Sequence, residues 1–210
     1  VSVVLIFASM VSDPATMLLV YAIENKDHKT ASFALKLGAN PNHVISTGKS
    51  ELSILSKAIL LFSSSEKDVL FLISEFLRAG ADPSYQDSQG LTALHWACRY
   101  LVPPSAIELL LNRSPDLLNI TTNEFETAFH YAIDQHHQWE CVLDVVRVLL
   151  KYGADPNKAS GVQQTPPLVI NHYSYTLSVV RSLRNTQQQQ QQQHRYRHVV
   201  IEAFKLWNYC

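Results

Sequence analysis

Two kinds of apolar segment alternate along the first three quarters of the chain. The first kind is short and follows a Ser or Thr, as in residues 92–97 and 127–132, which read TALHWA and TAFHYA, with looser versions at 18–22 and 50–53. A hydroxyl residue is typical of a helix N-cap, because its side chain accepts a hydrogen bond from a backbone N–H of the first turn. The Leu or Phe and the Ala that follow have the spacing of a helix face turned toward a core. The pattern therefore predicts a short helix after each hydroxyl residue.

The second kind of apolar segment is the last stretch before a turn. It occurs at residues 33–37, 72–77, 107–111 and 145–150. Three of these stretches end at a glycine, namely Gly38, Gly80 and Gly153, which is followed by Ala, by Asn or Asp, and by Pro. A glycine can take the left-handed conformation that closes a helix, and the proline prevents the helix from continuing. The chain thus repeats a pair of helices and a turn, with a weaker turn at residues 114–116.

The spacing of the repeats predicts turns of constant length. Twelve residues separate the first glycine of a turn from the next hydroxyl residue in three copies, and thirteen separate the equivalent positions in the fourth. In the second copy this count places the helix start at Ser50, which we prefer, although residues 55–59 resemble residues 94–98 three positions late. The extra length of the copies falls between the two helices of a pair, where loops absorb insertions at little entropic cost.

These motifs resemble those of ankyrin repeats. The T-x-L-H-x-A segment, a second helix and L-x-x-G-A-D-P-N recur over about residues 14–170 with a period near that of this family. The resemblance implies an all-α, ankyrin-type solenoid of stacked antiparallel helix pairs joined by short β-hairpin or loop fingers. We expect about four to five units over residues 14–180.

The two ends of the chain differ from the repeats. Residues 1–13 are an apolar segment, which fits either a partial unit or the remnant of an upstream domain, and Ser12 or Asp13 is expected to cap a helix that has Pro14 in its first turn. Residues 181–198 contain seven consecutive glutamines and several basic residues, so we expect a flexible insertion. Residues 199–210 have helical apolar spacing and are expected to form a capping helix.

Composition and charge narrow the function. The chain has 210 residues, 47% of them hydrophobic, and a net charge of −1, which excludes a wholly disordered chain and removes the electrostatic drive for nonspecific nucleic-acid binding. The last thirty residues are basic, with five Lys or Arg against one Asp or Glu. The longest apolar run, residues 3–8, is far too short to cross a membrane. We expect a monomeric, intracellular protein, cytoplasmic or nuclear, without a membrane segment.

No set of residues predicts catalysis, a metal site or a cofactor. The three cysteines include no C-x-x-C pair, so reduced thiols are expected. Gly48, Lys49 and Ser50 end like a phosphate-binding loop, but His43 stands where that motif needs glycine. His95 and His130 hold equivalent repeat positions, where the resemblance implies buried structural imidazoles. His136, His137 and Glu140 are too few ligands for zinc and are expected on a solvated loop.

The resemblance implies a noncatalytic module that binds a partner protein in the concave groove of the array. The candidate contact residues are those that resemble the family's variable, groove-facing positions: Thr47, Lys49, Ser88, Gln89, Leu91, Trp96, Arg99, Tyr100, Asn123, Glu124, Glu126, Tyr131, Asp134 and Gln135. Among them, Trp, Tyr and Arg are the residue types that most often dominate interface energies. The alternative is the substrate-recognition part of an enzyme complex, such as a ubiquitin-ligase adaptor.

Overall fold

The computed structural model describes residues 13–158, apart from 47–50, 134–138 and 156–157. The expectations for residues 1–12, for a fifth unit beyond residue 158, for the 181–198 insertion and for the 199–210 cap lie outside the described residues. So does the expected loop around His136 and His137. Among the described residues, no helix has the length and apolar character needed to span a lipid bilayer.

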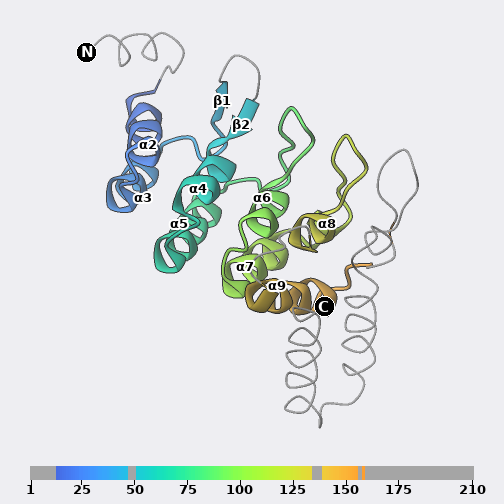
Figure 1. The fold of residues 1–210 in the computed structure, drawn as a ribbon. Helices are drawn as coiled ribbons and strands as arrows, with labels where there is room; N and C mark the ends of the chain where they lie inside the picture. Colours follow the sequence, from blue (N-terminus) through green and yellow to red (C-terminus); the bar gives the residue numbers. More distant parts are fainter. Residues whose placement is uncertain (1–12, 47–50, 134–138, 156–157, 159–210) are drawn as a thin grey trace.

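Eight α-helices of the described residues form four consecutive pairs (Figure 1). The pairs are α2 (Pro14–Glu24) with α3 (His28–Lys36), α4 (Ile54–Phe62) with α5 (Glu66–Arg78), α6 (Ala93–Arg99) with α7 (Pro104–Arg113), and α8 (Ala128–Ile133) with α9 (Trp139–Lys151). The first helices contact one another in the order α2, α4, α6, α8, and the second helices in the order α3, α5, α7, α9. Fingers project from one side of this double row (Figure 1). The predicted solenoid of stacked helix pairs is therefore confirmed.

Each first helix begins with a pair of polar residues three positions apart. The pairs are Asp13 with Thr16, Ser53 with Ser56, Thr92 with His95, and Thr127 with His130. The second member of each pair is buried, with at most 6% of its surface exposed. Burial of a polar group costs free energy unless the group is hydrogen-bonded, and the capping residue supplies that bond. The expected cap at Asp13 is confirmed, because its carboxylate accepts from the backbone N–H of Ala15 and of Thr16.

The start of the first helix in the second unit differs from the prediction. The finger before it is a β-hairpin of β1 (Val44–Ser46) and β2 (Glu51–Ser53), in which Ile45 pairs with Leu52. Helix α4 begins after Ser53, whose Oγ accepts from the backbone N–H of Ser56 at 3.1 Å. The preference for Ser50 is therefore wrong by three residues. Residues can be added between two paired strands without moving the base of the hairpin, so the number of residues in a finger is not fixed.

The predicted glycine caps are present where the chain supplies a glycine. Gly38, Gly80 and Gly153 have φ angles of 92°, 91° and 95°, in the left-handed region. Helix α7 ends without such a glycine, and the chain continues into the 3-10 helix η1 (Pro115–Leu118), which buries Leu117 completely. At the weaker turn, residues 114–116, a 3-10 helix therefore follows the second helix in place of a glycine cap.

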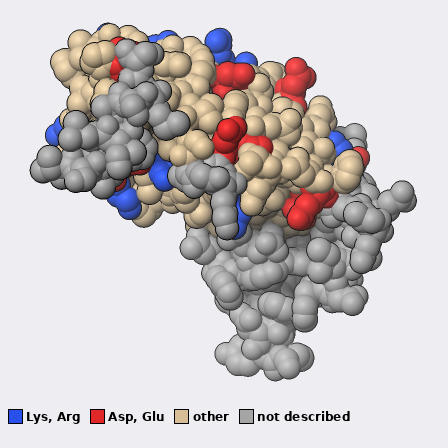
Figure 2. Space-filling view, turned by 90° about the horizontal axis from the view of Figure 1, so that it is seen from above, with Lys and Arg blue, Asp and Glu red and all other residues tan. Residues whose placement is uncertain are grey.

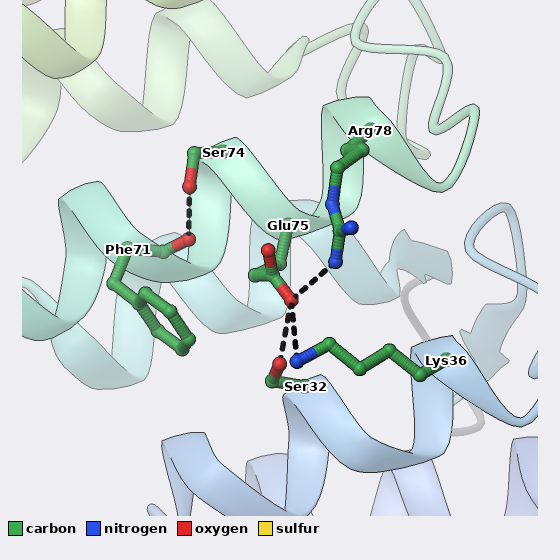
Figure 3. A network of polar contacts seen from close by, with 6 residues as sticks. All are labelled: Ser32, Lys36, Phe71, Ser74, Glu75 and Arg78. Carbon is green, nitrogen blue, oxygen red and sulfur yellow. Dashed lines mark hydrogen bonds and ion pairs between the residues drawn. The ribbon is translucent and has the colours of Figure 1, made fainter.

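Polar contacts join neighbouring second helices. Glu75 on α5 accepts a 2.5 Å hydrogen bond from Ser32 Oγ on α3 and one of 2.9 Å from Arg78, and Lys36 Nζ lies 3.8 Å from the same carboxylate oxygen (Figure 3). The hydrogen bond from Ser32 lowers the pKa of Glu75 most, and the two cations lower it further. Farther along the row, Lys151 on α9 pairs with Glu108 on α7 at 2.8 Å. These contacts occupy the side of the stack that lies away from the fingers.

Candidate functional site

The first helices and the fingers form one face of the array. We call the surface of α4, α6, α8 and the fingers that precede them the inner face (Figure 1). Most of the predicted contact residues lie on it. Thr47, Lys49, Asp134 and Gln135 fall outside the described residues.

An aromatic stack lies at the centre of the inner face. The rings of Trp96 on α6 and of Tyr100, the C-cap of that helix, are parallel within 5°, with their centroids 6.0 Å apart. The Arg99 guanidinium lies 5.7 Å from the centroid of the Trp96 ring, within the range of a cation–π contact. Tyr100 and Arg99 are exposed, whereas Trp96 is partly buried against the core. Three of the predicted contact residues therefore form one cluster.

Asp87 holds this cluster to the third finger. Its Oδ2 accepts a 3.0 Å hydrogen bond from Trp96 Nε1, and its Oδ1 accepts from the backbone N–H groups of Gln89 and Leu91, each at 2.9 Å. One carboxylate therefore fixes both the turn of the finger and the orientation of the indole. No motif of the sequence marks Asp87 as a functional residue. Its position in the turn, four residues before Leu91 and nine before Trp96, is the only signal in the sequence.

Tyr131 extends the aromatic surface onto α8. Its ring meets the His95 ring edge to face, with the centroids 5.6 Å apart. Burial, followed by the charge of Glu126 and a hydrogen bond with that side chain, raises the pKa of Tyr131 to about 12 against the opposing charge of Arg99. The phenol therefore remains protonated at neutral pH and acts as a polar, uncharged group beside the stack.

Hydrogen bonds join the fingers of neighbouring units. The backbone N–H of Ser88 donates to the Glu51 carbonyl at 3.4 Å, the N–H of Asn123 donates to the Gln89 carbonyl at 3.0 Å, and Asn123 Nδ2 donates to the Ser88 carbonyl at 3.1 Å. Ser88, Gln89 and Asn123 thus hold the second, third and fourth fingers in register. This ordering prepares a continuous surface before any partner arrives, which reduces the entropy lost on binding.

Leu91 does not belong to the exposed surface. Only 1% of its surface is exposed, so the prediction that it faces a partner is wrong. Leu91 directly precedes the N-cap Thr92 at the base of the finger, where an apolar side chain gains more from burial than from solvent contact. The spacing that marks finger positions does not distinguish the tip of a finger from its base.

The histidines of the repeats are structural. His95 is fully buried, its Nδ1 accepts from the backbone N–H of Thr92 at 3.1 Å, and its Nε2 lies 3.3 Å from the Glu126 carbonyl oxygen. Burial lowers the pKa of His95 and of His130 to about 4 each. Both rings are therefore neutral at physiological pH. The predicted buried imidazoles are confirmed.

The described residues include no metal-binding cluster, and the cysteine of α6 is buried. Cys98 is fully buried on α6, and burial raises the pKa of its thiol, so it lacks the thiolate character that a nucleophile needs. Across the part of the chain that the structure describes, no group of three or more His, Cys, Asp or Glu side chains is placed to hold a metal ion. The inner face therefore offers contact area and hydrogen-bonding groups.

Comparisons with known proteins place this architecture in a family. The family model for ankyrin repeats matches residues 60–160 with three copies. An ankyrin repeat protein of Acanthamoeba polyphaga mimivirus is 36% identical over 76 residues, which cover 36% of this chain and 17% of that protein. The transient receptor potential channel pyrexia of Drosophila melanogaster is 32% identical over 134 residues, which cover 49% of this chain and 13% of the channel. The chain spans less than one fifth of the length of these two relatives.

The repeats of this array are therefore ankyrin repeats. The structure adds the pair α2 and α3 and most of α4 to the array before the matched segment. Ankyrin repeats are, as a class, noncatalytic modules for protein–protein interaction.

Proposed function

We propose that this chain binds a partner protein on its inner face and catalyses no reaction itself. The observation that carries the proposal is the aromatic stack of Trp96 and Tyr100 at the centre of a row of fingers that are already hydrogen-bonded to one another. Aromatic side chains with one polar end give large contact areas at low entropic cost, and they are frequent among the residues that dominate interface energies.

The contacts within the stack support a role as a docking platform. Tyr100 keeps 37% of its surface exposed although it is a large aromatic residue. Its ring is held parallel to the indole of Trp96, and the indole is held in turn by Asp87. A partner side chain that packs on Tyr100 therefore contacts a surface that is already ordered, so little conformational entropy is lost on binding.

Replacement of Tyr100 and Trp96 together by alanine is expected to reduce partner capture at least tenfold. Removing two central aromatic anchors commonly costs more than 2 kcal/mol of binding free energy, or about thirtyfold in affinity. The measurement is affinity capture from a lysate with the wild-type and variant proteins, quantified by mass spectrometry. Because Trp96 also bonds Asp87, the single variant Tyr100→Ala is measured as well, and circular dichroism melts establish which variants are folded.

The matched control is Phe33→Ala on α3 with Leu37→Ala at the C-cap of the same helix. These side chains are apolar and each is 57% exposed, but they lie on a second helix. The proposal requires that proteins captured by the wild type remain captured by this control and are lost from Tyr100→Ala. Equal losses from both variants, or no loss from folded Tyr100→Ala, contradict it.

A further inference from the structure

Two of the three fingers of the inner face, the third and the fourth, are acidic, whereas the second contains one Lys and one Glu, Lys49 and Glu51. The third finger, residues 80–92, contains Asp82 and Asp87 and no Lys or Arg, and the fourth, residues 114–127, contains Asp116, Glu124 and Glu126 and no Lys or Arg. Seen from the finger side, acidic side chains stand over the middle of the array (Figure 2). The chain as a whole carries a net charge of only −1, so the negative charge of this face is local.

The carboxylates follow the row of hydrogen-bonded fingers. Glu51 is exposed on β2 of the second finger, and its carbonyl accepts from Ser88 of the third. Asn123, which donates to the Ser88 carbonyl, directly precedes the exposed Glu124 of the fourth finger. Glu51 and Glu124 therefore lie on one continuous surface across three fingers, on either side of Asp87.

The nearby carboxylates raise the pKa of two tyrosines between the fingers, Tyr85 and Tyr131. Burial raises the pKa of Tyr85, and the charges of Glu51 and Asp87 raise it further. The pKa of Tyr131 is raised in the same way by burial and then by Glu126 and Glu124. The same carboxylates that surround the aromatic side chains would attract a cationic side chain that approaches them.

Cations of the chain already lie by this surface: Arg99 beside the aromatic stack, and Lys158, whose Nζ donates to the Asn119 carbonyl of the fourth finger at 3.0 Å. Arg99 lies over the Trp96 ring and lowers the pKa of Tyr131, so its positive charge acts on the same surface. Its position shows that the aromatic stack accepts a guanidinium group in an acidic setting. A lysine or arginine of a partner would find the same two attractions, an aromatic ring face and nearby carboxylates.

From this complementarity we propose that the partner presents a basic segment, rich in Lys and Arg, which lies along the second to fourth fingers between Glu51 and Glu124. This inference rests on the proposed function, because it names the chemistry of the partner for the same face. It commits to a segment of another protein and not to a second copy of this chain.

The probe is a library of random 12-residue peptides displayed on phage and selected on the full chain. Selected peptides are expected to be enriched in Lys and Arg and to bind less tightly as salt is added. The variant Glu51→Gln with Glu124→Gln is expected to weaken them about five- to tenfold, as measured by fluorescence anisotropy. The matched control, Glu66→Gln with Asp144→Asn, removes the same number of charges from exposed positions on α5 and α9 and is expected to leave the affinity unchanged.

Arg99 gives a test with the opposite sign. The variant Arg99→Gln removes a cation that competes for the acidic surface, so basic peptides are expected to bind about two- to fivefold more tightly. A surface that recognises its partner only by shape and apolar contact would bind no better after this change. Unaltered or weaker binding of basic peptides by folded Arg99→Gln contradicts the proposal.

The outcomes separate this inference from the proposed function. Neutral or acidic peptides whose binding is lost in Tyr100→Ala would overturn the inference and leave the proposed function standing. Basic peptides that are weakened equally by both charge variants would also overturn the inference. Peptides that bind Tyr100→Ala and Glu51→Gln with Glu124→Gln as tightly as the wild type would overturn the inference and the proposed function. Self-association in sedimentation that disappears in Glu51→Gln with Glu124→Gln would assign the surface to a second copy and overturn the inference.

Discussion

Lowering the pH from 6.5 to about 4.5 is expected to remove much of the stability of the array. His95 and His130 have a pKa near 6.5 in the unfolded chain, and burial lowers it to about 4 in the folded chain. Between these values the unfolded chain binds protons that the folded chain does not, so unfolding becomes more favourable as the pH falls. At 1.36 kcal/mol for each pKa unit, each histidine costs about 3 kcal/mol at the lower end of this range. Domains of this size have only about 5–15 kcal/mol in total.

Urea unfolding at a series of pH values measures this loss. The control is His95→Gln with His130→Gln, whose amide oxygens can accept from Thr92 and Thr127 but do not titrate. This variant is expected to be less stable at pH 7 and to have a much flatter profile above about pH 4.5. The pKa values of Asp13, Asp27 and Glu75 are lowered from ordinary values of 3.8, 3.8 and 4.5, so their contribution is lost mainly below the lower end of this range. Parallel profiles for the two proteins contradict the assignment.

Replacing Gly90 by alanine is expected to cost about 2–4 kcal/mol and to separate the third finger from the fourth. Gly90 has a φ angle of 81°, which strains any residue with a Cβ atom. A Cβ atom at this position would also lie 2.8 Å from the backbone nitrogen of Asn123 and 3.0 Å from Thr122 Cα. Backbone atoms cannot yield as the end of a side chain can, so the neighbouring finger must move.

The matched control is Gly80→Ala. Gly80 has a φ angle of 91°, and a Cβ atom there would meet no atom within 4 Å, so only the backbone strain of about 1 kcal/mol remains. Denaturant unfolding gives the two free energies. Amide hydrogen exchange of Asn123, whose N–H donates to the Gln89 carbonyl, reports on the contact between the fingers. Equal destabilisation by both variants, with unchanged protection of Asn123, would contradict this role of Gly90.

The fold could be predicted from the sequence because its signals are local and repeated. Capping hydroxyl residues, left-handed glycines and prolines mark the ends of helices by their own backbone chemistry. The residue count that places the start of α4 at Ser50 fails because the finger before it is a paired hairpin, and the capping pair of Ser53 and Ser56 marks the true start. Ser53 and Ser56 have the same spacing as Thr92 and His95, which is the register in which residues 55–59 correspond to residues 94–98.

The candidate surface could be predicted only in part. The Trp96, Arg99 and Tyr100 cluster follows from helical spacing, since Trp96 and Arg99 lie in the last turn of α6 and Tyr100 is its C-cap. Contacts between fingers could not be derived, because they join residues about 35 positions apart, such as Ser88 and Asn123. A helix that started at Ser50 would include Glu51, which instead lies in the hairpin of the second finger. Leu91 is predicted at the exposed surface but is buried, because the spacing of residues in the sequence does not show how deep in the structure a side chain lies.

The most direct test of the account is a nuclear magnetic resonance titration of the isotope-labelled chain with a peptide selected from the random library. The account predicts that the indole N–H signal of Trp96 and the amide signals of Tyr100, Asn123 and Glu124 shift on binding, while those of α5, α7 and α9 do not. Shifts that concentrate on the second helices, with the Trp96 indole signal unchanged, would contradict the claim that the inner face binds the partner.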